Sequence, residues 1–82
     1  MKKFRTINDL GNIIRYFRKK RGMTQAQLAK ECKLTQVFIS KLENGGGSTL
    51  HTLFTVLSAL KIELSLSEIQ NLDTDNPLSL LE

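Results

Sequence analysis

The sequence is poor in the residues from which catalytic and metal sites are built. It contains one histidine and one cysteine, so an internal disulfide is excluded. It shows no pair of carboxylates, no cluster of metal-ligating side chains and no Ser–His–Asp arrangement. We therefore expect a protein that is not an enzyme and that binds no cofactor and no metal.

Long apolar runs are missing as well. No run approaches the roughly 20 residues that a helix needs to span a bilayer, and no signal peptide is visible. We expect a soluble, cytoplasmic protein that does not contact membranes. Cys32 falls on an apolar helical stripe, which favours a buried thiol over a reactive or metal-binding one.

The length limits how much surface the chain buries. Its 82 residues make one small domain, and a domain of this size buries only about 60 % of its unfolded surface. Because a lone monomer would be marginally stable, we expect oligomerisation.

Charge is distributed unevenly along the chain. Residues 1–22 contain eight basic side chains against Asp9 alone, whereas residues 62–82 contain five acidic side chains and no basic one. A basic front half suits contact with nucleic-acid phosphates, which releases condensed counterions. The acidic end is not expected to lie on DNA.

Residues 23–45 carry the pattern of two short helices separated by a tight turn. Thr24 caps the first helix, and Gln27 can complete a capping box with it. Thr35 caps the second helix, which Asn44-Gly45 ends. The side chains at inward-facing helical spacing are Leu28, Ala29, Cys32, Ile39 and Leu42. Two helices joined by so short a turn cross steeply, as in the helix-turn-helix that enters a major groove.

A helix is predicted before this motif. Asn8 or Asp9 is expected to cap it, and Gly22 ends it. Its apolar stripe comprises Leu10, Ile13, Ile14 and Phe17. This stripe is expected to pack onto the helix-turn-helix. Residues 1–8 form a basic arm, which either contacts phosphates or is disordered.

Another helix is predicted after the motif. It follows a loop of three glycines, is capped by Ser48 or Thr49 and runs to Leu60. Its expected apolar face comprises Leu50, Leu53, Phe54, Leu57 and Leu60. The sequence thus predicts a mainly all-α fold of four to five helices, whose helix-turn-helix domain covers residues 9–60.

Three short motifs resemble the Cro/C1-type (Xre-like) repressors. They are TQ-x-x-LA at the start of the motif, IS in its second helix and LENG at its end. The resemblance covers about residues 10–60. The chain departs from the family at Lys33, where a turn glycine is common, so lysine must adopt a strained turn there. The resemblance implies an ion pair between Arg18 and Glu43, to which we assign a structural role.

The periodicity changes after residue 60. Apolar Ile62, Leu64 and Leu66 alternate with polar residues, which predicts a strand over residues 61–68. A single strand cannot satisfy its own backbone groups, so we expect it to pair with its copy across a two-fold axis. The alternative is an extension of the preceding helix.

An Xre-like domain followed by one strand and a short tail is similar to the HipB-type antitoxins. That resemblance implies a homodimer that represses its own toxin–antitoxin operon and binds a HipA-like serine/threonine kinase toxin. The acidic tail, residues 69–82, is either a frayed end or a segment that docks on the toxin. Its apolar residues are Leu78, Leu80 and Leu81. The alternatives are a free-standing phage-type or restriction-controller repressor and, from another class, a helical adaptor that binds only protein.

The second helix of the motif is expected to read bases in the major groove. Gln36 can pair with adenine, Val37 can contact a thymine methyl group, and Lys41 can reach guanine. Ser40 is expected to bond a base or a phosphate. Phe38 faces either the DNA or the helical core.

Three further residues are expected to hold phosphates, namely Gln25, Thr35 and Asn44. A dimer implies pseudo-palindromic double-stranded DNA. Its half-sites would lie one helical turn, about 34–36 Å, or a multiple of it apart.

Overall fold

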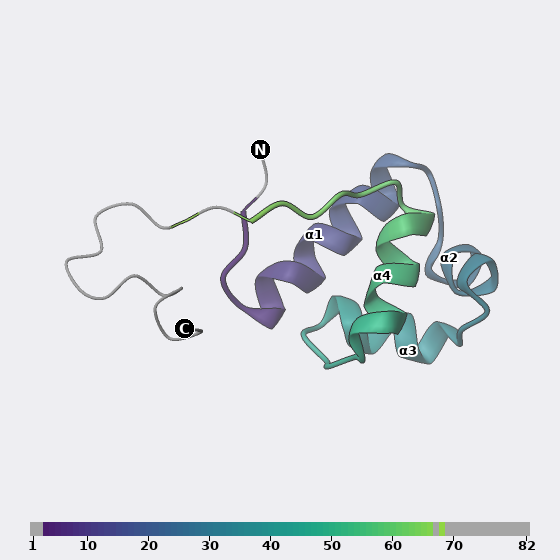
Figure 1. Cartoon of the computed structure of the whole chain (residues 1–82). Helices are drawn as coiled ribbons and strands as arrows, with labels where there is room; N and C mark the ends of the chain where they lie inside the picture. Colours follow the sequence, from purple (N-terminus) through teal and green to yellow (C-terminus); the bar gives the residue numbers. More distant parts are fainter. Residues whose placement is uncertain (1–2, 67, 69–82) are drawn as a thin grey trace.

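The computed structural model describes residues 3–66 and residue 68. These contain four α-helices: α1 (Ile7–Lys20), α2 (Gln25–Cys32), α3 (Gln36–Glu43) and α4 (Leu50–Ala59). Helix α3 packs against both α1 and α2, and α4 packs against α2 (Figure 1). The all-α prediction is confirmed, with four helices in the part of the chain that the structure describes.

Apolar side chains from all four helices and the residue after α4 form one core. Its buried members are Ile14, Leu28, Ala29, Cys32, Ile39, Leu42, Val56, Leu57 and Leu60. All five residues predicted to face inward from the helix-turn-helix are among them. Phe38 is half-buried and packs against this core, so it belongs to the core side of α3.

Threonine hydroxyls cap the starts of the helices. Thr24 Oγ1 accepts from the Gln27 backbone N–H at 3.0 Å, and Gln27 Oε1 accepts from the Thr24 N–H at 2.8 Å. This is the predicted capping box. Thr35 caps α3 in the same way, as predicted. Thr49 caps α4, so it is Thr49 and not Ser48 that begins this helix. Each cap satisfies an N–H that has no partner inside the helix.

The prediction for the start of α1 is wrong, because Thr6 caps this helix rather than Asn8 or Asp9. Thr6 Oγ1 accepts from the Asp9 N–H at 3.0 Å. The Asp9 carboxylate instead accepts from the Arg5 N–H at 3.2 Å, before the helix. The hydroxyl and the carboxylate three residues later thus act together, so α1 begins at Ile7, inside the stretch assigned to the arm.

The turn between α2 and α3 contains a residue in the left-handed region. Lys33 has φ 61° and ψ 40° and forms the C-cap of α2. This is the strained turn that the missing glycine predicts. Gly22 and Gly45 end α1 and α3 with φ 70° and 92°, values that cost glycine little.

The predicted apolar face of α4 is partly wrong. Leu50 and Phe54 are 72 % and 50 % exposed, whereas Val56, which the prediction omitted, is fully buried. Helix α4 packs mainly on α2, so only one side of it is covered within a single chain. Leucine periodicity alone did not indicate which side this is.

No strand is present among residues 3–66 and 68, although a strand was predicted over residues 61–68. Ile62 and Leu64 are half-buried against the core, while Glu63 and Ser65 are exposed. Leu66 is 99 % exposed. One chain offers this segment no partner strand with which to form a ladder. The predicted tail residues Leu78, Leu80 and Leu81 lie outside the described residues.

Candidate nucleic-acid interface

One open groove runs along the outer face of α3 beside the start of α2. Five side chains line it: Gln25, Gln36, Val37, Ser40 and Lys41. All four residues predicted to read bases therefore lie together with one of the three residues predicted to hold phosphates. The spacing of the four predicted base-reading residues along α3 places their side chains on one side of this helix.

The groove offers groups of several chemical kinds. An amide, a hydroxyl and an ammonium group provide hydrogen-bond donors, and the first two also accept. Val37 contributes an apolar surface and is 63 % exposed. Such a set can distinguish the edges of base pairs, where donors, acceptors and the thymine methyl group alternate.

Thr35 and Asn44 do not line the groove. The Thr35 hydroxyl accepts from the Phe38 N–H at 3.1 Å. Asn44 Oδ1 accepts from Arg15 Nη2 at 3.2 Å, and Asn44 Nδ2 donates to the Ser40 carbonyl at 2.8 Å. Both side chains thus have structural partners at the ends of α3, and their phosphate contacts stay predictions.

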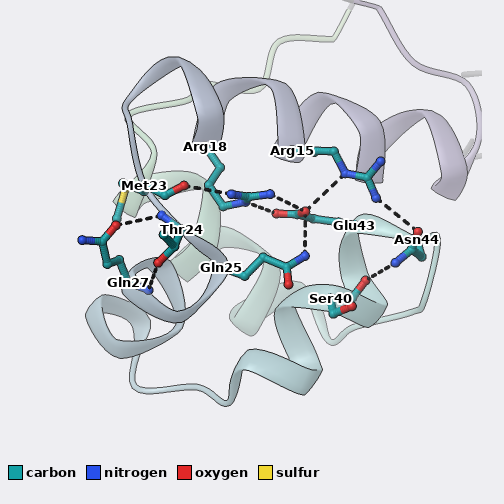
Figure 2. Close-up of polar contacts among 9 residues, drawn as sticks. All are labelled: Arg15, Arg18, Met23, Thr24, Gln25, Gln27, Ser40, Glu43 and Asn44. Carbon is teal, nitrogen blue, oxygen red and sulfur yellow. Dashed lines mark hydrogen bonds and ion pairs between the residues drawn. The ribbon is translucent and has the colours of Figure 1, made fainter.

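Arg18 and Glu43 form a buried ion pair that joins α1 to α3 (Figure 2). Arg18 Nε and Nη2 donate to the two carboxylate oxygens of Glu43 at 2.6 and 3.1 Å. Arg18 Nη1 donates to the Met23 carbonyl at 2.8 Å. Glu43 is 1 % exposed, so its charge is held by these donors rather than by water.

Two further side chains donate to the same carboxylate. Gln25 Nε2 lies 3.1 Å and Arg15 Nε 3.4 Å from Glu43 Oε1. Figure 2 shows Gln25 and Arg15 approaching this oxygen from different helices. Because Gln25 also lines the groove, the buried ion pair fixes the orientation of a groove residue.

The pKa of Glu43 is lowered from its ordinary value. Burial by itself raises the pKa of this carboxyl, but hydrogen bonds from Arg18, Gln25 and Arg15 and the charge of Arg18 together outweigh burial. The ionised form is therefore the stable form in the folded protein.

Arg15 was expected only as part of the basic front half and not as a member of this network. A usable signal was its place three residues before Arg18, since side chains three apart on a helix lie on neighbouring positions of one face.

Cys32 has the environment of a structural thiol. Its side chain is buried, and burial followed by the charge of Glu31 raises its pKa. The thiol form, which is a poor nucleophile, is therefore favoured. Among the described residues there is no group of three or more metal-ligating side chains, and no helix there is long and apolar enough to cross a membrane.

Comparison with curated proteins links the chain to one kind of regulator. Antitoxin HipB of Escherichia coli (strain K12) is 34% identical over 64 residues, which cover 77% of this chain and 73% of the relative. HipB of Escherichia coli O6:H1 is 34% identical over 64 residues, covering 77% of this chain and 68% of that protein.

Solved structures give the same fold. The HipA-HipB-O2-O3 complex contains a chain with TM-score 0.76 and 31% identity, covering 85% of this chain and 100% of that one. The restriction-modification controller protein C.AhdI from Aeromonas hydrophila has TM-score 0.66 and 26% identity, and the match covers 70% of this chain and 84% of that one.

The family assignment agrees with the groove and its helices. The helix-turn-helix family HTH_3 matches residues 14–67, which include the second half of α1, the groove and all of α4. Its members are DNA-binding regulators rather than enzymes. The chain is therefore a DNA-binding regulator with HipB antitoxins among its homologues, and it belongs to the HTH_3 helix-turn-helix family.

Proposed function

We propose that this protein is a sequence-specific repressor that acts as the antitoxin of a type II toxin–antitoxin operon. It represses that operon and binds a HipA-like serine/threonine kinase toxin. The groove with its four clustered reading residues carries the DNA-binding part of the proposal. The 34% identity with HipB, and the solved complex of HipB with HipA, support the antitoxin part.

In the proposed mechanism, α3 lies in the major groove with its N-terminal end toward the bases. Gln36 pairs with an adenine edge, Val37 packs on a thymine methyl group, and Lys41 reaches guanine. Ser40 bonds a base or a phosphate at the same face. Gln25, oriented by Glu43, has a second amide hydrogen free to donate to a phosphate.

The proposed repressor is a homodimer that binds a pseudo-palindromic operator. Its dimer contact is a ladder between residues 61–68 of the two copies, with Ile62, Leu64 and Leu66 on the apolar face. The half-burial of the first two and the full exposure of Leu66 support this, because the stripe continues past the edge of one core.

The reading residues are tested by comparing two DNA probes. One is the duplex directly upstream of the protein's own gene, and the other is a random duplex of equal length. Gln36→Ala should lower affinity for the first about 10–100-fold, because a good bidentate contact contributes about 1–3 kcal/mol of discrimination. Gln25→Ala should lower the affinity for both probes by the same factor. Equal losses on both probes for Gln36→Ala would overturn the base-reading assignment.

The antitoxin role is tested by a pulldown from the native host. The bait is the full-length protein, and a version that ends at Gln70 is the control bait. A kinase-like protein captured by the long form alone assigns docking to the tail, and capture by both forms places docking on the helical domain. Recovery of DNA without a protein partner would instead establish the second candidate, a free-standing repressor of the kind that the likeness to C.AhdI supports.

A further inference from the structure

Arg15 has more hydrogen-bonding capacity than its contacts within the protein use. Its Nε donates to Glu43 Oε1 at 3.4 Å, and its Nη2 donates to Asn44 Oδ1 at 3.2 Å. A guanidinium carries five N–H donors. In the described part of the chain the other three have no protein acceptor, and the side chain is 38% exposed.

Glu43 does not need Arg15 for its charge to be balanced. Arg18 already donates to both carboxylate oxygens, at 2.6 and 3.1 Å, and its side chain is 9% exposed. The Arg15 contact is longer, and it reaches an oxygen that accepts from two other donors as well. Two guanidinium groups and one carboxylate retain one positive charge, which lies on Arg15, the exposed member.

Shared hydrogen-bond partners link this charge to two residues of the groove, although Arg15 itself does not line it. Arg15 shares its acceptor oxygen with Gln25, a groove residue. Its second acceptor, Asn44, donates to the carbonyl of Ser40, another groove residue. Figure 2 shows Arg15 extending from α1 to the end of α3, with Glu43 on one side of its guanidinium and Asn44 on the other.

We propose that Arg15 is a phosphate-binding residue of the DNA interface, and that Glu43 and Asn44 hold its guanidinium in position. The ligand is a phosphodiester of the duplex, because a planar guanidinium matches two phosphate oxygens with parallel N–H donors. The sugar-phosphate backbone of DNA borders any helix that lies in the major groove. A cation at the edge of the reading face is therefore placed to contact a phosphate. Because Glu43 and Asn44 hold the Arg15 side chain before DNA binds, less conformational entropy is lost on binding.

This inference rests on the proposed DNA-binding function and deepens it. Its test uses a random-sequence duplex, because a phosphate contact is independent of base sequence. The affinity is measured over a series of salt concentrations for the full-length protein and for Arg15→Gln. Each lost phosphate contact should reduce the slope of log K against log salt by about 0.9, so a dimer should lose about 1.8.

Two further variants separate phosphate binding from other effects. Lys20→Gln is the matched control, since Lys20 is an exposed cation of the same helix whose ammonium lies 5.7 Å from the Phe17 ring. It should leave the slope near that of the wild type. Arg15→Lys keeps the charge but not the paired donors, so it should restore most of the slope and only part of the affinity.

The outcomes are distinct. An equal loss of affinity at every salt concentration, with an unchanged slope, would overturn the proposal and give Arg15 a structural role. A slope change no larger than that of Lys20→Gln would also overturn it. A wild-type protein that binds no duplex at low salt would overturn the DNA-binding function together with this inference. Binding to DNA without capture of a kinase would remove only the antitoxin role and leave the Arg15 assignment standing.

Discussion

At the scale of single residues, Glu43 connects three helices through one carboxylate. It lies at the end of α3 and accepts from Arg15 and Arg18 of α1 and from Gln25 of α2. Removing one partner of such a buried pair leaves the other charge without compensation, which is more costly than never having had the pair. The same carboxylate orients Gln25 at the groove, so the stability of the fold and the proposed DNA contact of Gln25 depend on one group.

Acid should destabilise the protein through Glu43. Its pKa in the folded state lies below the ordinary value of about 4.3, which we take for the unfolded chain. The ionised carboxylate therefore stabilises the fold fully above that ordinary value, and this stability is lost as the pH falls through the lower folded-state pKa. We expect the free energy of unfolding, measured in urea, to fall steeply below about pH 4.5.

The matched variants for this prediction are Glu43→Gln and Glu31→Gln. Glu43→Gln should lower the free energy of unfolding at neutral pH by about 3 kcal/mol and flatten its fall in acid. Glu31 is exposed on α2 and lies outside this network, so its replacement should leave the free energy of unfolding at neutral pH within about 0.5 kcal/mol of the wild type. Parallel pH profiles for Glu43→Gln and the wild type would show that another group causes the acid transition.

Lys33 is a second residue whose conformation has a measurable cost. A left-handed conformation costs a residue with a Cβ atom roughly 1–2 kcal/mol, and glycine avoids most of this at some cost in unfolded-chain entropy. Lys33→Gly should therefore raise the free energy of unfolding by about 1 kcal/mol. Lys30→Gly, inside α2, should lower it by about 1 kcal/mol. A loss of stability in both variants would contradict this account of the turn.

At the scale of elements, the contact between α1 and α3 depends on the absence of a side chain at Gly11. A Cβ atom there would lie 2.5 Å from the Glu43 carbonyl oxygen and 2.6 Å from that of Leu42. Backbone carbonyls cannot rotate away as side chains do, so Gly11→Ala must separate the helices. We expect a net loss of about 2 kcal/mol in thermal or urea unfolding, since overpacking outweighs alanine's helix propensity.

Gly47→Ala is the control for this substitution. A Cβ atom at Gly47 meets nothing within 4 Å, and this residue does not have a positive φ. Its stability should stay within about 0.5 kcal/mol of the wild type, as for other surface changes. If Gly11→Ala were as stable as this control, the close approach of α1 and α3 would be refuted.

Local chemistry explains which elements could be predicted from the sequence. The central helices have caps and core residues within a few positions of each other, so Thr24, Gln27 and Thr35 indicated their starts. The start of α1 was misplaced because Thr6, Asn8 and Asp9 are all residues that can cap a helix, and only the hydrogen bond from the Asp9 N–H to Thr6 decides between them. The covered side of α4 depends on α2, which no local pattern of leucines reveals.

The same distinction applies to the groove. Helical spacing is enough to place Gln36, Ser40 and Lys41 on one face of α3. The contact of Arg15 with Asn44 joins residues 29 positions apart, and neither side chain indicates its partner in the sequence. Gly11 is similar, since its role is visible only once α3 lies across it.

At the scale of the whole molecule, a single chain leaves apolar surface uncovered. Leu50 and Phe54 of α4 are exposed, and so is Leu66 after it. Exposed apolar surface formed by several large side chains is commonly covered by a binding partner. A second copy is the partner that we propose, because the alternation after residue 60 continues beyond the core of one chain.

Leu66→Asp tests the dimer without disturbing the fold of one chain. Leu66 is 99 % exposed, so the substitution removes no contact within a monomer. In a strand-paired dimer it places two carboxylates on the apolar face. Burying a leucine contributes about 1.5–3 kcal/mol, so the dimer dissociation constant in sedimentation equilibrium should rise at least about tenfold. Ser65→Asp, on the exposed face, should have little effect.

DNA binding gives this prediction a second readout. A palindromic duplex would engage the α3 helices of both copies in the proposed dimer, and a half-site would engage only one. Leu66→Asp should therefore weaken binding to the palindrome and leave half-site binding unchanged, because the groove around Gln36 and Ser40 remains intact in each chain. Equal dissociation constants for Leu66→Asp and Ser65→Asp would instead show that residues 61–68 lie outside the dimer contact. The exposed side of α4, with Leu50 and Phe54, would then be the surface to substitute next.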